Sequence, residues 1–357
     1  MNGRDRWHAV THYQPCDRLF RWEMGPWSKT LRRWEREGLP ENDYFERIIG
    51  LDRLESVPVS VLEPCPTFVE ENLEVRDGYR IYRTPAGVIR KRLLNDGDST
   101  MPQFLDHPIK NRGDWVEYKK RLDPDTPRRF PLWWDSLKAS YADRDFALGI
   151  RAGSMFGSLC RWIGMERFCV MFYDEPHFVH EMMDYLADFY VKVLEKVVFA
   201  VKLDYAILWE DMAYKTASMI SPQQVREFMV PGYKKITDLL HSAGIDIIAL
   251  DSDGNVEQLI PIWLECGINF MLPMEVAAGM DVVRLRKKFG KELRMAGGMD
   301  KRVLATGDRR KIRQMVDGVR DLILEGGYVP AVDHFIPSDV SWESFRYYRG
   351  LLDEIGS

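Results

Sequence analysis

The chain has 357 residues, of which 45% are hydrophobic and 29% are charged, a composition typical of a globular protein with a large core. Its net charge of −5 gives no basic excess for binding nucleic-acid phosphates. No apolar run reaches the roughly 18 residues of a membrane span, and the polar N-terminal residues are unlike a signal peptide. The five cysteines form no CxxC pair and indicate reduced thiols. We therefore expect a cytoplasmic protein that binds neither nucleic acid nor membranes.

The first part of the chain contains two candidate strands, near residues 19–22 and 57–62. The segment from about residue 64 to 131 is different, because it is rich in charge, proline and glycine and has no sustained periodicity. This composition predicts a hairpin and a lid-like insertion over the mouth of the fold. The residues before it form an N-terminal extension.

The remaining residues alternate between short apolar runs and amphipathic stretches, which is typical of βαβ units in a parallel sheet. Helices are predicted at about 176–201, from Ser221-Pro222 to near 244, and at about 256–265, 281–289 and 309–325. Strands are predicted at 147–150, 205–209, 246–250, 268–272, 293–296 and 328–332. With the earlier candidates the strand count approaches eight. A closed (β/α)8 (TIM) barrel, forming a single domain over residues 1–357, fits this pattern better than an open sheet.

Acidic residues follow several predicted strands, at the positions that face the active site of such a barrel. These are Glu210, Asp211, Asp251, Asp253, Glu275, Asp300 and Asp333, and His334 lies among them. Carboxylates confined together repel one another, and a bound divalent cation relieves the repulsion. Asp251, Asp253 and His334 are therefore predicted to hold a metal ion such as zinc with one position open. As alternatives, Asp253 could cap the helix beginning near Val256, and His334 could be a polar residue held by Asp333.

Large apolar side chains are candidates for a ligand pocket. Trp22, Met24, Trp27 and Trp209, with Glu275 at the rim, are predicted to bind substrate, since ligand pockets are mostly lined by apolar and aromatic groups. The alternative is that these tryptophans only pack the core. Glu210, Asp211, Asp300 and His334 are the candidates for catalysis.

The same positions carry a resemblance to the uroporphyrinogen decarboxylase superfamily that spans nearly the whole chain. The resemblance implies the TIM-barrel fold predicted above. The motifs are Trp209-Glu210-Asp211, Ile220-Ser221-Pro222, Asp253-Gly254-Asn255, Gly297 to Lys301 and Asp333 to Pro337, and in the earlier part Asp17-Arg18, Tyr82 to Gly87 and Gly157 to Phe168.

This superfamily contains decarboxylases of uroporphyrinogen and zinc-dependent methyltransferases that exchange methyl groups with a corrinoid. The decarboxylases have an arginine-rich N-terminal loop that grips the substrate carboxylates. Residues 21–27 resemble this loop in position but lack its arginine pair, which argues against porphyrinogen decarboxylation. In the methyltransferases a His-x-Cys pair and a later Cys bind zinc. Here Asp251-Ser252-Asp253 and His334 occupy similar positions, so the implied site has harder ligands and favours an oxygen-containing methyl donor.

The leading hypothesis is a metal-dependent, methyltransferase-like enzyme that demethylates a small, possibly methoxylated substrate and passes the methyl group to a corrinoid (cobalamin) carried by a partner protein. One alternative is a metal-free lyase of the uroporphyrinogen decarboxylase type, acting on a tetrapyrrole or another small carboxylated compound. A second alternative is a non-catalytic barrel that binds a corrinoid or tetrapyrrole. The protein could form a homodimer. The sequence does not identify the oligomeric state, the substrate or the metal.

Overall fold

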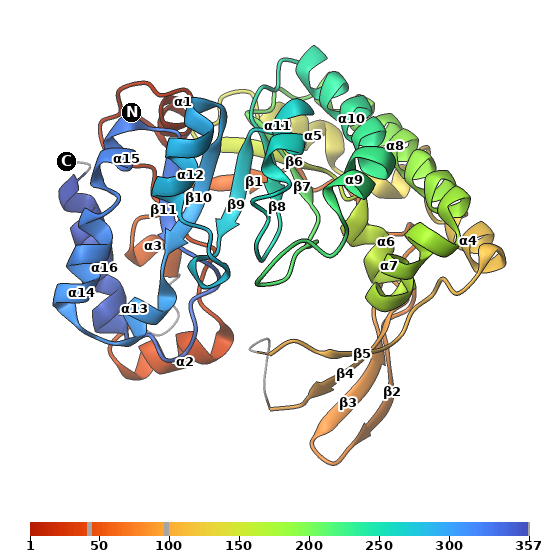
Figure 1. The fold of residues 1–357 in the computed structure, drawn as a ribbon, viewed down its shortest axis with the longest axis horizontal. Helices are drawn as coiled ribbons and strands as arrows, with labels where there is room; N and C mark the ends of the chain where they lie inside the picture. Colours follow the sequence, from red (N-terminus) through yellow and green to blue (C-terminus); the bar gives the residue numbers. More distant parts are fainter. Residues whose placement is uncertain (41–44, 96–99, 356–357) are drawn as a thin grey trace.

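The main element of the fold is a parallel sheet of seven strands in the computed structural model, which describes residues 1–40, 45–95 and 100–355 (Figure 1). The strands are neighbours in chain order, and each has few polar residues because both of its faces are covered. They are β1 (Leu54–Ser56), β6 (Ala147–Gly153), β7 (Tyr205–Trp209), β8 (Ile248–Asp251), β9 (Phe270–Met274), β10 (Arg294–Met299) and β11 (Tyr328–Val332).

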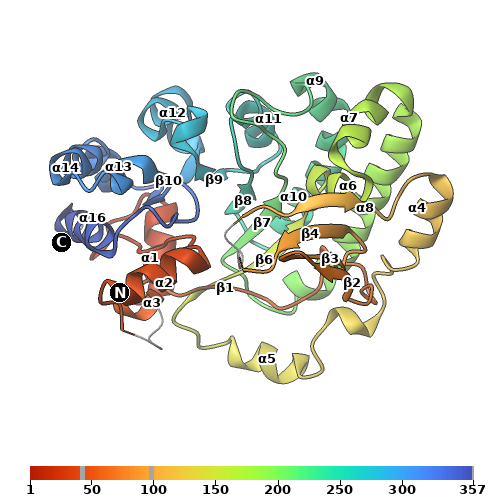
Figure 2. The same cartoon turned by 90° about the horizontal axis from the view of Figure 1, so that it is seen from below.

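Helices surround this sheet on its outer side, as Figure 2 shows from below. The long helix α8 packs against α10, and Ser221 caps the turn before Pro222 as the sequence predicts. A π-helical turn, Val225–Met229, leads into α10. The helices are α1 (Gly3–Thr11), α2 (Ser28–Arg36), α3 (Phe45–Ile48), α4 (Arg112–Lys119), α5 (Trp134–Ser140), α6 (Phe156–Ile163), α7 (Met165–Asp174), α8 (Pro176–Val198), α9 (Pro222–Gln224), α10 (Val230–Ser242), α11 (Ile260–Glu265), α12 (Val282–Phe289), α13 (Lys301–Ala305), α14 (Arg309–Asp317), α15 (Arg320–Glu325) and α16 (Trp342–Ile355).

The segment predicted to form a lid-like insertion contains a second, antiparallel sheet. Its strands are β2 (Glu71–Arg76), β3 (Tyr79–Arg83), β4 (Ile89–Leu93) and β5 (Gln103–Asp106), in that order. We call β2–β5 the insertion sheet. It projects beside α6 and α7, on the side toward which the strands of the main sheet point (Figure 1). The predicted hairpin is therefore one part of a larger sheet.

The main sheet does not close into the predicted eight-stranded barrel. Within the described residues β1 and β11 are its two edges, and the predicted strand at 19–22 is absent. An extended segment, residues 19–27, lies between these edges instead. Arg21 O accepts a hydrogen bond from Asp52 N at 2.8 Å beside β1, and Gly25 O accepts one from Ile336 N at 3.0 Å beyond β11. The prediction of a closed barrel was wrong, because this segment makes too few backbone bonds to count as a strand.

The interior of the curved sheet is an apolar cluster that helix α1 covers from the amino ends of the strands. Trp7 of α1 packs against Tyr205 and Phe270, with ring centroids 5.1 and 5.7 Å away. Trp22 and Leu54 line the same small interior cavity. The sheet thus has the filled centre of a TIM-like barrel, and we call the opposite end, where the strands finish, the mouth.

Most predicted elements of the second half are present. Strands β7 and β11 match their predicted ranges, while the bounds of β6, β8, β9 and β10 differ from the predicted ones by up to three residues. The prediction at 57–62 was wrong, since β1 lies just before it, and the predicted helix at 309–325 is two helices, α14 and α15. None of the described helices is long and apolar enough to cross a bilayer.

Candidate functional site at the mouth of the barrel

Three aspartates meet at the mouth, and we call Asp211, Asp251 and Asp253 the acid cluster. One carboxylate oxygen from each lies within 4.8 Å of the other two. Asp251 is the last residue of β8, and Trp209 of β7 is its partner in register. The cluster therefore forms because two adjacent parallel strands end at the same edge of the sheet.

The loops after β7 and β8 hold the acid cluster by interlocking. Asp211 has φ of 42°, a left-handed conformation that a residue with a side chain adopts only under constraint. Met212 N donates to Ser252 Oγ at 3.1 Å, joining the two loops. A Cβ on Gly254 would lie 2.6 Å from the carbonyl oxygens of Ala213 and Tyr214. Only glycine fits this close approach, so the loops are fixed relative to one another.

The acid cluster carries more negative charge than its surroundings compensate. Burial, and then the charges of Asp211 and Asp253, raise the pKa of Asp251 to about 7, although Arg151 and His334 oppose the shift. Burial and Asp253 raise the pKa of Asp211 to about 6. Carboxylates in this state are stabilised by a proton or by a nearby cation.

His334 lies beside the acid cluster. Its Nε2 is 3.3 Å from Asp253 Oδ2, so Asp253, rather than Asp333, is the carboxylate that it contacts. Burial lowers the pKa of His334, but the hydrogen bond and the charge of Asp253 outweigh it, and the net shift is upward. The ring of Trp27 packs 6.4 Å away, centroid to centroid, and 4.7 Å from Phe335. Of the predicted metal set, Asp251 and Asp253 lie together, but the third member of their cluster is Asp211, and His334 contacts Asp253 without belonging to it.

Three further charged residues, Glu275, Lys301 and Asp333, contact one another and the loop that carries the acid cluster. Glu275 Oε2 accepts a hydrogen bond from Gly254 N at 2.9 Å, and Lys301 Nζ lies 3.4 Å from Glu275 and 3.5 Å from Asp333. Asp333 is buried and also accepts from Val276 N at 3.0 Å, and its pKa is raised by burial. These contacts join the loops after β8, β9, β10 and β11. Glu275, predicted to bind substrate, holds the loop that carries Asp253.

Two of the predicted catalytic carboxylates have partners elsewhere. Glu210 is fully buried and accepts hydrogen bonds from the amides of Met155, Phe156 and Gly157 and from the Tyr233 hydroxyl, at 2.7–3.2 Å. It fixes β7 to the start of α6, and burial raises its pKa to about 7 despite these bonds. Asp300 caps α13 through Arg302 N at 2.8 Å and pairs with the Arg302 guanidinium. Neither belongs to the acid cluster.

The predicted aromatic pocket residues separate into two groups. Trp22 lines the apolar interior below the mouth, and Met24 is half-buried in the segment between the sheet edges. Trp27 and Trp209 lie beside the cluster, because Trp27 packs near His334 and Trp209 is two residues before Asp211, whose pKa its side chain lowers. The guanidinium of Arg161 lies 5.5 Å from the Trp209 ring centroid.

Sequence reasoning missed Arg151, an exposed residue inside the otherwise buried strand β6. Its charge lowers the pKa of Asp251, so it faces the mouth. The guanidinium of Arg151 makes no hydrogen bond or ion pair to any residue that the structure describes. A single charged residue within an apolar strand was the signal that could have identified it.

The donor set of the acid cluster fits a divalent metal ion. It offers three carboxylates with an imidazole next to them, and such oxygen and nitrogen donors suit zinc, iron or manganese. The upward shifts of the pKa values of Asp211 and Asp251 show an unmet demand for positive charge. Asp211, Asp251 and Asp253 are the residues that would hold the ion, with His334 within reach of Asp253.

A TIM-like barrel with carboxylates and a histidine at its mouth defines a class of α/β enzyme whose site is built from strand-end loops. The sequence profile of the family "Uroporphyrinogen decarboxylase (URO-D)" matches residues 94–354. The chain belongs to this family, which confirms the resemblance found in its motifs.

Comparison with solved structures agrees on the fold. A methyltransferase from Methanosarcina mazei superposes with a TM-score of 0.62 at 16% identity, covering 99% of each chain. The IOLI protein with a bound zinc atom reaches a TM-score of 0.28 at 12% identity, covering 69% of this chain and 86% of that one. No curated protein sequence matches the chain significantly.

Proposed function

We propose that the protein is a metal-dependent, methyltransferase-like enzyme that moves a methyl group from a small oxygenated substrate to a corrinoid on a partner protein. The observation that carries this proposal is the acid cluster, three carboxylates within 4.8 Å of one another with His334 on Asp253. The family and the fold shared with the Methanosarcina mazei methyltransferase support the reaction class.

The residues of the mouth have separate tasks in this proposal. Asp211, Asp251 and Asp253 hold the ion, zinc being the expected one. When bound, the ion supplies Lewis acidity that makes the demethylated oxygen a better leaving group. His334 holds a proton on the imidazole next to Asp253, from which it can pass to that oxygen. Trp27 and Trp209 cover the two sides and exclude water.

The N-terminal segment supports a methyltransferase-like reaction over porphyrinogen decarboxylation. Its arginines already have partners at the edge of the barrel. Arg18 pairs with Asp52 at 2.6 Å, and Arg21 pairs with Asp353 at 3.0 Å. They are thereby held as structural ion pairs, so this segment offers no free guanidinium pair to a polycarboxylate.

The test combines metal analysis with a methyl-transfer assay. We expect about one divalent ion per purified chain, lost in Asp253→Ala and kept in Asp317→Ala, whose exposed carboxylate on α14 is the matched control. Methoxylated aromatic compounds and cob(I)alamin are then supplied, and methylcobalamin is followed by absorbance. A metal-free protein, or an Asp253→Ala variant with undiminished activity, contradicts the proposal.

A further inference from the structure

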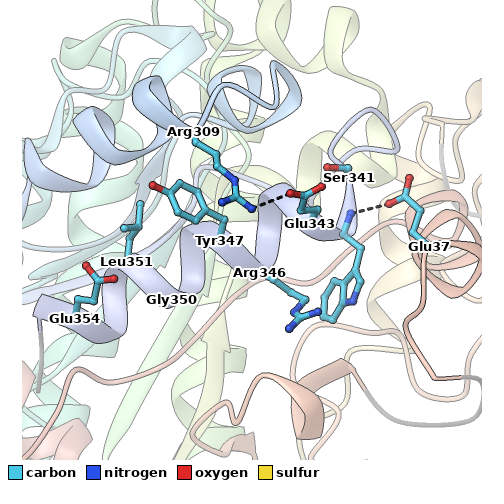
Figure 3. Close-up of a pocket in the computed structure, with 10 residues that line it drawn as sticks. Glu37, Arg309, Ser341, Glu343, Arg346, Tyr347, Gly350, Leu351 and Glu354 are labelled. Atoms are coloured by element: carbon cyan, nitrogen blue, oxygen red, sulfur yellow. Dashed lines mark hydrogen bonds and ion pairs between the residues drawn. The ribbon is translucent and has the colours of Figure 1, made fainter.

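Charged side chains on the outer surface of this protein mostly find partners. In the cavity beside α16, Arg309 pairs with Glu343 at 2.8 Å, and Glu37 accepts a hydrogen bond from Trp342 N at 2.7 Å (Figure 3). These contacts already occupy the carboxylates of Glu37 and Glu343. Arginines between the barrel and the insertion sheet behave differently.

The guanidinium of Arg161 on α6 has a partner on one of its edges and none among the described residues on another. Its Nη1 pairs with Glu63 at 3.0 Å. Its Nε and Nη2, the two donors that together form the lateral fork of a guanidinium, are buried and have no hydrogen-bond partner among the described residues. Leaving such donors buried and unfilled costs free energy, so a ligand that filled them would bind favourably.

A second guanidinium, that of Arg90, is near enough to Arg161 for the two like charges to interact. Arg90 comes from β4 of the insertion sheet, stacks on Phe104 at 4.7 Å, and also has a buried Nε without a partner. Burial, and then the like charges of Arg161 and Arg92, lower the pKa of Arg90 although Tyr82 opposes the shift. Glu63 is the carboxylate paired with Arg161, and it is outnumbered by the guanidiniums. Among the residues that the structure describes, Arg161 and Arg90 together therefore carry one positive charge more than Glu63 balances.

Two other buried arginines show what a purely structural role looks like here. Arg129 donates to the backbone carbonyls of Ser60, Glu63, Arg121 and Asp123 at 2.7–3.1 Å, which fills its guanidinium. Arg349 also has unfilled nitrogens, but the buried carboxylate of Glu23, 3.1 Å away, balances its charge. The Arg161 site differs from Arg129 in its unfilled donors, and from Arg349 in having a second guanidinium, Arg90, beside its single carboxylate partner.

The arginine site adjoins the acid cluster through one side chain. Trp209 precedes Asp211 by two residues and its side chain lowers the pKa of Asp211, while the Arg161 guanidinium lies 5.5 Å from its ring centroid. One small molecule could thus contact Arg161 and reach the acid cluster past the indole. The insertion sheet, which lies beside α6 and α7 in Figure 1, carries Arg90 on β4.

We propose that Arg161 and Arg90 bind an anionic group of the substrate, a carboxylate or a phosphate, through the free fork of Arg161. This inference rests on the proposed function only in directing the reacting end of the same molecule to the acid cluster. The anion receives two parallel N–H bonds from Arg161 and charge compensation from Arg90. The substrate class is then a small, oxygenated and anionic compound.

The test measures binding of two simple anions, benzoate and inorganic phosphate, by titration calorimetry at constant ionic strength. One or both should bind the purified protein, and the one that binds identifies the group. Arg161→Gln should weaken that binding at least tenfold, and Arg90→Gln several-fold. Arg112→Gln, which removes an exposed arginine paired with Glu181, is the matched control and should change nothing. Absence of binding by both anions, or equal binding by Arg161→Gln, overturns the proposal.

Two further measurements keep the result interpretable. Arg161→Lys retains the charge but loses the fork, so it should fold and still bind the anion more weakly than the native protein. This variant carries the test if Arg161→Gln fails to fold. Repeating the titration after removal of metal with EDTA separates the two proposals, because binding that depends on Arg161 should persist there. A protein that binds the anion but no metal would contradict the proposed function alone.

Discussion

Buried aspartates at the two ends of the barrel strands experience opposite surroundings. Asp204, just before β7, accepts bonds from Arg4, Arg144 and Leu148 N at 2.7–2.9 Å, and its pKa lies well below the ordinary value because these contacts and His8 outweigh burial. Asp251, at the end of β8, has carboxylates as near neighbours and a raised pKa. The closed, charge-balanced end stabilises the fold, whereas the mouth maintains a charge imbalance that a ligand can relieve.

The largest expected effect is on activity at the mouth. Asp251→Asn should lower methyl transfer at least about 100-fold, because a proposed metal ligand is lost. The substitution also removes the repulsion between Asp251 and the carboxylates of Asp211 and Asp253. The free energy of unfolding of the metal-free variant should therefore equal or exceed that of the native chain. Urea denaturation and the methylcobalamin assay measure the two quantities. A much lower free energy of unfolding in the metal-free variant would contradict the view that Asp251, unlike Asp204, does not stabilise the fold.

The converse is expected at the closed end. Asp204→Ala should lower the free energy of unfolding by about 3–5 kcal/mol, because it leaves the buried Arg144 guanidinium without its carboxylate. Metal content per folded chain should stay unchanged. Denaturant unfolding and metal analysis provide the check, with Asp317→Ala as the surface control. Loss of metal from the folded variant would show that the two ends are coupled.

A smaller effect is expected for His334→Gln. Activity should fall about 10- to 100-fold if the imidazole acts next to Asp253. Metal content should remain near that of the native protein in this case. Loss of the metal together with activity would instead place His334 among the ligands, as the sequence predicts. The metal-to-protein ratio of the purified variant decides between these outcomes.

The smallest expected effect is the pH dependence of the contribution that Asp204 makes to the free energy of unfolding. Its pKa is lowered in the folded state, so its stabilisation is present above the unfolded pKa of about 3.9 and is lost as pH falls through the folded value. The stability difference between the native chain and Asp204→Ala should therefore be constant near pH 6–7 and shrink below about pH 4. Urea midpoints across this range measure it. A difference that grows in acid would contradict the assignment.

The sequence predicts the second half of the fold well, because buried parallel strands and amphipathic helices differ in periodicity. It fails at residues 19–27, since an extended segment held by a few scattered bonds has no periodic pattern of its own. The four strands of the insertion sheet were also hidden, because they are short, contain many charged residues and bury few side chains.

The candidate site was predictable in part for a geometric reason. Residues that follow strands gather at one mouth, so Asp251 and Asp253 lie together, whereas the third member of the cluster is Asp211 and His334 contacts only Asp253 among them. The same rule could not separate Asp211, which joins the cluster, from Glu210, which turns inward to the start of α6. That choice depends on the left-handed backbone of Asp211, which no local sequence pattern signals.

The segment that fills the gap between β1 and β11 has a consequence for how the chain matures. Glu23 accepts a hydrogen bond from Val332 N, 309 residues later, and Gly25 bonds Ile336. These early residues cannot make those bonds until β11 and the residues just after it have been synthesised. The barrel is therefore sealed last, by joining the beginning of the chain to its end.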